Sequence, residues 1–215
     1  MRRIAHGTAV YGLIILLLSV IGCIGSHPPS QPVKYYQLDY PSPKISLDKT
    51  PLPYVIRVDP FQPSDLYRSQ RIVYQDGRYL ASRYPYHQWI TAPDRMVPKF
   101  LVRDLRHADI VNAVFFNSGE AATHRLVGNL EAFYENDQPN PWKAVAAVSM
   151  ALMETGGDMD IAEQICFQKT YKVNKTCTEN TPAGFVAAMS RAMAEISRLI
   201  INDIYNELSV AEGGD

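Results

Sequence analysis

The clearest hydrophobic pattern lies near the end of the sequence, where apolar residues recur at the spacing of one helical face. Thr181 is a suitable N-cap, and Pro182 suits the first helical position because an N–H there would be unpaired anyway. We therefore expect a helix that begins at Pro182 and buries one apolar stripe against a sheet. The stripe consists of Phe185, Met189, Ala192, Met193, Ile196, Leu199, Ile200 and Ile204.

A second helix is expected between Pro93 and His107, where apolar residues again recur at helical spacing. Thr91 is a suitable N-cap, and Asp94 favours the positive end of the helix dipole. Pro98 lies inside this pattern, so the start of the helix either shifts or kinks.

Other segments show the alternation, or the β-branched and aromatic content, that is typical of strands. Asp76-Gly77 predicts a tight hairpin, and Leu126, Leu130 and Tyr134 are expected on one face of their strand. The alanine-rich segment 142–154 suits a strand or a helix, so its periodicity leaves both open. The predicted strands are residues 34–40, 54–58, 66–75, 78–89, 110–116, 125–135, 142–154 and 161–173.

This order of elements predicts an α/β protein in α+β layers, a mixed sheet with two helices packed on one face. We see no repeat and no second domain, so residues 34–209 are expected to form a single domain. Residues 210–215 are expected to form a disordered tail.

The first 22 residues have the features of a secretory signal peptide. Arg2 and Arg3 precede an apolar core at Tyr11–Ile21, which is too short for a bilayer span of about 20 residues. Val20-Ile21-Gly22-Cys23 resembles a bacterial lipobox, so we expect cleavage before Cys23 and attachment of acyl chains there, palmitate among them. The alternatives are an uncleaved signal anchor or a soluble export with an incidental cysteine.

The residues after Cys23 indicate a flexible tether and the membrane to which the protein is sorted. Three prolines with Ser, Gln and Gly make residues 23–33 a lipidated and flexible connection to the domain. Ile24, rather than aspartate, follows the cysteine. By resemblance to enterobacterial sorting, this favours a lipid-anchored protein of the outer membrane that faces the periplasm.

The two remaining cysteines, Cys166 and Cys177, leave two interpretations open. An oxidising compartment permits a disulfide between them. Otherwise one is a buried thiol and the other an exposed thiol.

The net charge and the sequence motifs narrow the range of functions that the chain could have. Without residues 1–22 the chain carries 19 Lys and Arg against 22 Asp and Glu, a net charge of −3, and no basic cluster that would indicate nucleic-acid binding. We find no nucleophile elbow, P-loop, dinucleotide fingerprint or zinc-protease motif. His87, beside Trp89, is interpreted as an ordinary strand histidine. We therefore expect no catalytic residue, metal ion or cofactor.

Several segments, in this order, resemble the auxiliary lipoproteins of ABC-type transport systems. They are the lipobox at Cys23, Tyr36-Gln37-Leu38, Arg71-Ile72-Val73-Tyr74, Tyr84-Pro85-Tyr86-His87-Gln88-Trp89, Leu126-Val127-Gly128-Asn129-Leu130-Glu131-Ala132-Phe133, and the final Ala/Met-rich helix. The resemblance implies a fold similar to the N-terminal domain of TolB. It also implies a non-enzymatic protein whose partners are an MCE (mammalian cell entry) domain protein and its ABC transporter subunits.

On this hypothesis the protein docks the periplasm-spanning MCE assembly to the outer membrane for intermembrane lipid transport. The resemblance also implies that copies of the chain can form a homo-oligomer. A general envelope-assembly lipoprotein, which binds another outer-membrane machine or the cell wall, is the main alternative. A lipid-anchored hydrolase with an unrecognised site is the third hypothesis.

Overall fold

The computed structural model describes residues 31–44, 51–62, 65–138, 140–156, 160, 162 and 164–212. The predicted signal peptide, Cys23 and most of the predicted tether lie outside these residues. Val33–Asp215 forms one compact unit. Its elements, in chain order, are β1 (Lys34–Tyr36), β2 (Leu52–Val58), β3 (Arg71–Asp76), β4 (Leu80–Trp89), α2 (Pro93–Ala108), β5 (Val111–Phe116), β6 (His124–Asn136), β7 (Lys143–Glu154), β8 (Ile165–Thr176) and α3 (Pro182–Glu212).

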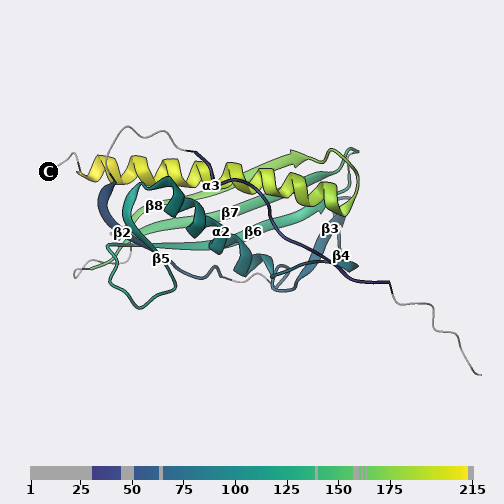
Figure 1. The fold of residues 1–215 in the computed structure, drawn as a ribbon, viewed down its shortest axis with the longest axis horizontal. Coiled ribbons are helices and arrows are strands. Elements are labelled where there is room, and N and C mark those ends of the chain that lie inside the picture. The colour runs from purple at the N-terminus through teal and green to yellow at the C-terminus, as the bar shows by residue number, and fades with distance from the viewer. Residues whose placement is uncertain are drawn as a thin grey trace, which may run out of the picture. The chain divides into compact units, whose positions relative to one another are not determined.

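Strand β6 organises the sheet, because it pairs with different strands along its two edges. On one edge β7 pairs antiparallel with it from His124 to Asn136, and β8 pairs antiparallel with β7. On the other edge β2 runs parallel to the start of β6, and β3 runs parallel to its end. β5 extends the β2 branch, while β4 and then β1 extend the β3 branch (Figure 1).

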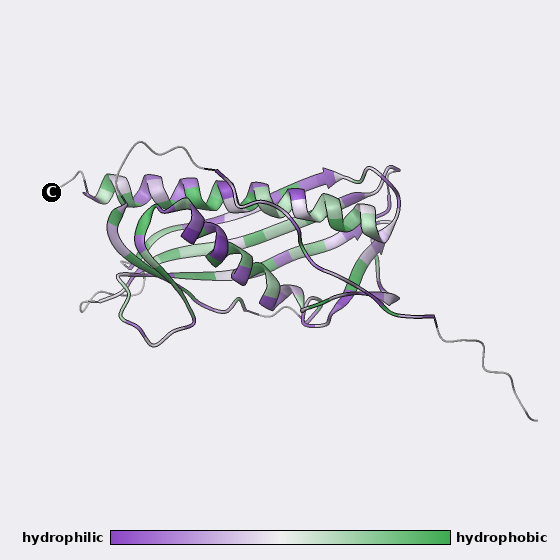
Figure 2. Ribbon diagram, viewed as in Figure 1, coloured by the Kyte–Doolittle hydropathy of each residue, from purple (hydrophilic) through white to green (hydrophobic). Residues whose placement is uncertain are grey.

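Both helices pack on one face of this sheet, as the hydrophobic pattern predicts. The expected stripe of α3 faces β7 and β8, and α2 lies over β5 and β6 (Figure 1). Polar residues colour much of the outer side of α2 in Figure 2. Trp89 joins the layers, since its ring lies 5.3 Å from that of Phe133 on β6 and 5.9 Å from that of Phe185 on α3. Burying such large side chains contributes about 1.5–3 kcal/mol each.

The two helix starts differ from each other in how well the sequence predicted them. For α3 the prediction is confirmed, because Thr181 Oγ1 accepts a hydrogen bond from the Gly184 N–H at 3.0 Å. For α2 the predicted cap is wrong. Ala92 is the N-cap and offers only its carbonyl, which accepts from the N–H groups of Arg95 and Met96. Pro93 takes a first-turn position, where its missing N–H costs nothing, whereas Pro98 lies inside the helix and removes one i→i−4 hydrogen bond.

At the other end, α3 continues through Glu212, so the first residues of the expected tail are helical. Gly213 and Gly214, which weaken helices, come directly afterwards. Residues 213–215 lie outside the described part of the chain.

Residues 142–154, which the sequence left open, form the strand β7. Pairing on both edges decides the outcome, since β7 lies between β6 and β8 for almost its whole length. Ala144 and Ala146 are buried on one face of the sheet and Ala147 on the other, so tertiary pairing outweighs the helix propensity of alanine.

The hairpin between β3 and β4 is present, although its turn is longer than predicted. Asp76 pairs with Leu80, so three residues form the turn. Gly77 has a φ of 77°, a conformation that glycine adopts without strain.

The predicted strand 34–40 ends early because the chain leaves the sheet to cross the helices. The Asp39 N–H donates to Ser190 Oγ of α3 at 3.0 Å. Tyr40 Oη and Ser197 Oγ both donate to Asp104 Oδ2 of α2, at 2.9 and 2.7 Å. The fully buried Asp104 therefore ties this crossing segment and α3 to α2.

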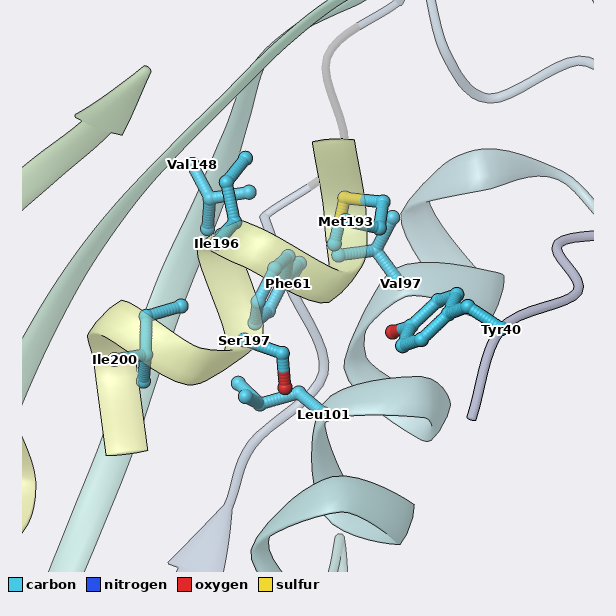
Figure 3. Close-up of a pocket in the computed structure, with 9 residues that line it drawn as sticks. All are labelled: Tyr40, Phe61, Val97, Leu101, Val148, Met193, Ile196, Ser197 and Ile200. Atoms are coloured by element: carbon cyan, nitrogen blue, oxygen red, sulfur yellow. The ribbon is translucent and has the colours of Figure 1, made fainter. Parts of the chain in front are cut away.

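The interior between the helices and the sheet is closely packed. A cavity of about 10 Å³ remains between Tyr40, Phe61, Leu101, Ile196 and Ser197, and Figure 3 shows these side chains converging on it. This is at the limit for one water molecule. The space is therefore far too small for a lipid chain.

Candidate functional site

Cys23, the residue that the sequence assigns to lipid attachment, lies outside the described residues. Among the residues that are described, no helix has the length and apolar character that crossing a bilayer requires.

Cys166 and Cys177, for which the sequence left a disulfide and two separate thiols open, are both free thiols in the structure. Cys166 lies at the start of β8 and Cys177 directly after its end. At about 3.3 Å per residue, an extended strand separates them by roughly 35 Å, whereas a disulfide joins Cα atoms within about 7 Å. The alternative describes them better: Cys177 is buried and Cys166 is partly exposed.

Histidines and acids do not gather into a metal site in the described part of the chain, where no group of three potential ligands occurs. His107 Nδ1 lies 3.0 Å from the carbonyl oxygen of Arg103, and His124 Nδ1 lies 2.9 Å from Thr123 Oγ1. Each of these two histidines therefore has its hydrogen-bond partner close by in the chain.

His87 instead belongs to a cluster of aromatic side chains from β1, β3 and β4. Its Nδ1 lies 2.9 Å from Tyr36 Oη, and the two rings stack with centroids 5.7 Å apart. The Tyr84 ring meets His87 edge-on at 5.4 Å and lies 4.7 Å from the Tyr74 ring. Desolvation, with the nearby charge of Lys34, lowers the pKa of His87, so the ring is neutral at pH 7. We name Tyr36, Tyr74, Tyr84 and His87 the aromatic cluster.

A fully buried carboxyl group lies behind the aromatic cluster. Tyr84 Oη donates to Glu135 Oε1 at 2.7 Å, while Glu135 Oε2 has no hydrogen-bond partner among the described residues. Desolvation raises the pKa of Glu135 to about 7, although the hydrogen bond from Tyr84 opposes the shift. Desolvation and the bond to Glu135 also raise the pKa of Tyr84, so the phenol keeps its proton.

Sequence reasoning missed Glu135 because a bulge in β6 reverses the expected alternation. The register shifts between Leu130 and Ala132, so Phe133 and Glu135 face the helices. Tyr134, predicted to share the face of Leu126 and Leu130, is only half-buried. A shift of one residue moves every later side chain to the other face. No residue type in this segment indicates a bulge, so the sequence pattern did not predict it.

Exposed apolar side chains lie at the β3–β4 turn and along the outer edge of β4. β1 pairs only with His87–Trp89, which leaves residues 80–86 without a strand on that edge in the described structure. Tyr79 is 88% exposed and Leu80 57% exposed, and Tyr86 is also exposed. We name Tyr79, Leu80 and Tyr86 the aromatic edge. Unpaired strand edges bind other chains unless they are protected.

This arrangement is a two-layer α/β domain, and comparisons with solved structures support that class. A Xanthomonas campestris protein matches with a TM-score of 0.73 at 13% identity, over 84% of this chain and 99% of its own. An uncharacterised protein matches with a TM-score of 0.63 at 15% identity, over 81% and 99%. At these identities the likeness concerns the fold, and it confirms the predicted mixed sheet with two helices.

The family model for the ABC-type transport auxiliary lipoprotein component matches residues 36–201. The chain therefore belongs to the ABC-type transport auxiliary lipoprotein family, as its motifs indicated. This is a family of transport auxiliary proteins and not a known enzyme family. A search of curated proteins returned no significant match.

Proposed function

We propose that this chain docks an MCE-type intermembrane lipid transport assembly, with its ABC transporter subunits, to the outer membrane. In this proposal residues 1–22 are removed, Cys23 carries the acyl chains, and residues 24–33 tether the domain in the periplasm. The membership of the family supports a role beside an ABC transporter. The observation that carries a docking role is the aromatic edge, an exposed apolar surface beside the part of β4 whose outer edge has no strand partner among the described residues.

An unpaired strand edge with apolar side chains is costly to leave exposed to water. Residues 80–86 present unpaired backbone groups, and the exposed side chains of Tyr79, Leu80 and Tyr86 add the aromatic and apolar composition that protein interfaces favour. Arg83 lies within this stretch and Arg78 just before it, and charges of this kind discourage pairing between identical edges. A partner segment that adds to β4 would satisfy the backbone and cover the tyrosines together.

The anchor is tested first. Cells that express the wild-type chain or Cys23→Ser are grown with labelled palmitate, and their envelopes are fractionated. We expect label and outer-membrane location for the wild-type chain, and neither for Cys23→Ser. A wild-type chain without label, or one that retains residues 1–22, contradicts the anchor.

Docking is tested by co-purification from detergent-solubilised envelopes. Tyr79→Ser combined with Leu80→Ser should lower recovery of the MCE and permease subunits by about tenfold or more, since central interface aromatics contribute about 2 kcal/mol or more. Val210→Ser is the matched control, because Val210 is 77% exposed in the last turn of α3. That end of α3 lies at the opposite end of the domain from β3 and β4 (Figure 1). Absence of these subunits from the wild-type sample, or equal recovery from all three, contradicts docking through this edge.

A further inference from the structure

A polar pocket of about 510 Å³ lies between the loop before β3 and the start of α2. Its walls include Arg68, Ser69, Gln70, Ile90, Thr91 and Arg95. Gln70 fixes the rim, since its Nε2 donates to the Ile90 carbonyl at 2.8 Å and its own carbonyl accepts from the Trp89 N–H at 2.6 Å. The pocket is therefore built on the paired ends of β3 and β4.

Two exposed guanidinium groups give this pocket a positive charge. Arg95 has no ion-pair partner within the described residues. Arg68 has only Asp65, at 3.4 Å, and Asp65 is almost fully exposed, so the pair is weak. The Ser69 hydroxyl is shielded from solvent and has no hydrogen-bond partner within the described residues. The planar guanidinium groups of the two arginines are exposed, and such groups donate paired hydrogen bonds to phosphate oxygens.

The pocket lies close to the point where the tether joins the domain. The Ile90 N–H donates to the Tyr36 carbonyl at 2.7 Å, and Tyr36 comes only three residues after Val33. From Cys23 to Val33 the chain spans at most about 36 Å, even when fully extended. A lipid-anchored Cys23 would therefore keep this end of the domain within reach of the bilayer surface.

We propose that this pocket binds the phosphate groups of anionic phospholipids at the surface of the membrane that holds the anchor. The proposal rests on the anchor at Cys23 assigned under the proposed function. Arg68 and Arg95 contact headgroup phosphates. Ile90, 55% exposed, and Tyr35, 60% exposed, lie at the depth where apolar and aromatic side chains meet lipid. The contact holds the domain in one orientation and leaves the hairpin of the aromatic edge at a fixed position for its partner.

The test uses the full-length, acylated protein in nanodiscs of phosphatidylcholine, alone or mixed with phosphatidylglycerol. Hydrogen exchange is measured on the peptides that cover residues 66–70 and 88–95. In the phosphatidylglycerol discs we expect exchange about fivefold slower or more, the effect of about one arginine near an anionic surface. Arg68→Gln combined with Arg95→Gln should abolish the difference. Lys172→Gln combined with Arg198→Gln removes the same charge from exposed positions on β8 and α3 and should preserve it.

Equal exchange in both kinds of disc, or a difference that the arginine variant retains, overturns the proposal. Slowing by inorganic phosphate in phosphatidylcholine discs assigns the pocket to a soluble anion and also overturns it. Mass measurement of the same sample reports acylation, so failure of the anchor is recognised separately. Loss of partner co-purification with protection retained would contradict docking and leave the lipid contact supported.

Discussion

Tyr84 and Glu135, 51 residues apart in the chain, form a hydrogen bond of 2.7 Å that connects an edge strand to the buried centre of the sheet. The phenol satisfies only one of the two carboxylate oxygens. A carboxyl group in this position is costly to ionise, which makes the stability of the domain depend on pH near neutrality.

The first prediction concerns that pH dependence. Folding raises the pKa of Glu135 from 4.5 to about 7, so between these values the folded state holds a proton that the unfolded state releases. Stability should therefore fall as the pH rises through this window. Glu135→Gln keeps an acceptor for Tyr84 and removes the charge. It should raise the melting temperature at about pH 8 by several degrees and change it little at about pH 4.5.

Glu131→Gln is the control for this prediction, because Glu131 is exposed on the same strand. It should leave the pH profile unchanged when melting is followed by circular dichroism. Identical profiles for Glu135→Gln and the wild-type chain would show that the buried carboxyl does not titrate in this range.

The second prediction concerns Asp104, which holds the crossing segment and α3 to α2. Asp104→Ala leaves the hydroxyl groups of Tyr40 and Ser197 without their acceptor, and removes the partner of Arg103. We expect the free energy of unfolding in urea to fall by about 3 kcal/mol. Tyr40→Phe removes one donor and should cost about 1 kcal/mol. If Asp104→Ala lowers the free energy of unfolding less than Tyr40→Phe does, the Asp104 hydrogen bonds do not hold the crossing segment and α3 to α2.

The third prediction explains the glycine in the family-like segment that begins at Leu126. A Cβ atom on Gly128 would lie 2.6 Å from Cε1 of the buried Phe61 ring. Gly128→Ala should therefore destabilise the domain by about 1–3 kcal/mol, the usual cost of overpacking. Gly119→Ala has no neighbour within 4 Å and should change the urea midpoint little. Equal midpoints for both variants would mean that the Phe61 ring moves aside at no cost.

The fourth prediction concerns the thiols. Desolvation raises the pKa of Cys177 to about 11, and it also raises the pKa of Cys166. Alkylation of the folded, non-reduced protein at about pH 7.5 should be slow, because only the thiolate reacts. Cys166 should react before the buried Cys177, and unfolding should expose both. Mass spectrometry after each step shows which cysteine has been alkylated. If neither cysteine is alkylated until a reductant is added, the two form a disulfide and the prediction is wrong.

The sequence predicted part of the candidate docking surface, and the tertiary structure was needed for the rest. The sequence identified the tyrosine-rich segment and the hairpin, because Asp76-Gly77 and the aromatic residues are local signals. It did not indicate which tyrosines are exposed. The short β1 covers β4 only at His87–Trp89, so Tyr79 and Leu80, at the other end of the hairpin, have no neighbouring strand on that side and are exposed.

By itself the sequence determined the features that are written into adjacent residues. These are the signal-like leader and its lipobox, the α3 stripe with its Thr181 cap, and the layered class of the fold. Tertiary structure alone decided the features that depend on partners distant in the chain. The β6 bulge buried Glu135, pairing on both edges made residues 142–154 a strand, and the length of β8 separated Cys166 from Cys177. Local propensities differ by about 1 kcal/mol or less, and such long-range pairing outweighs them.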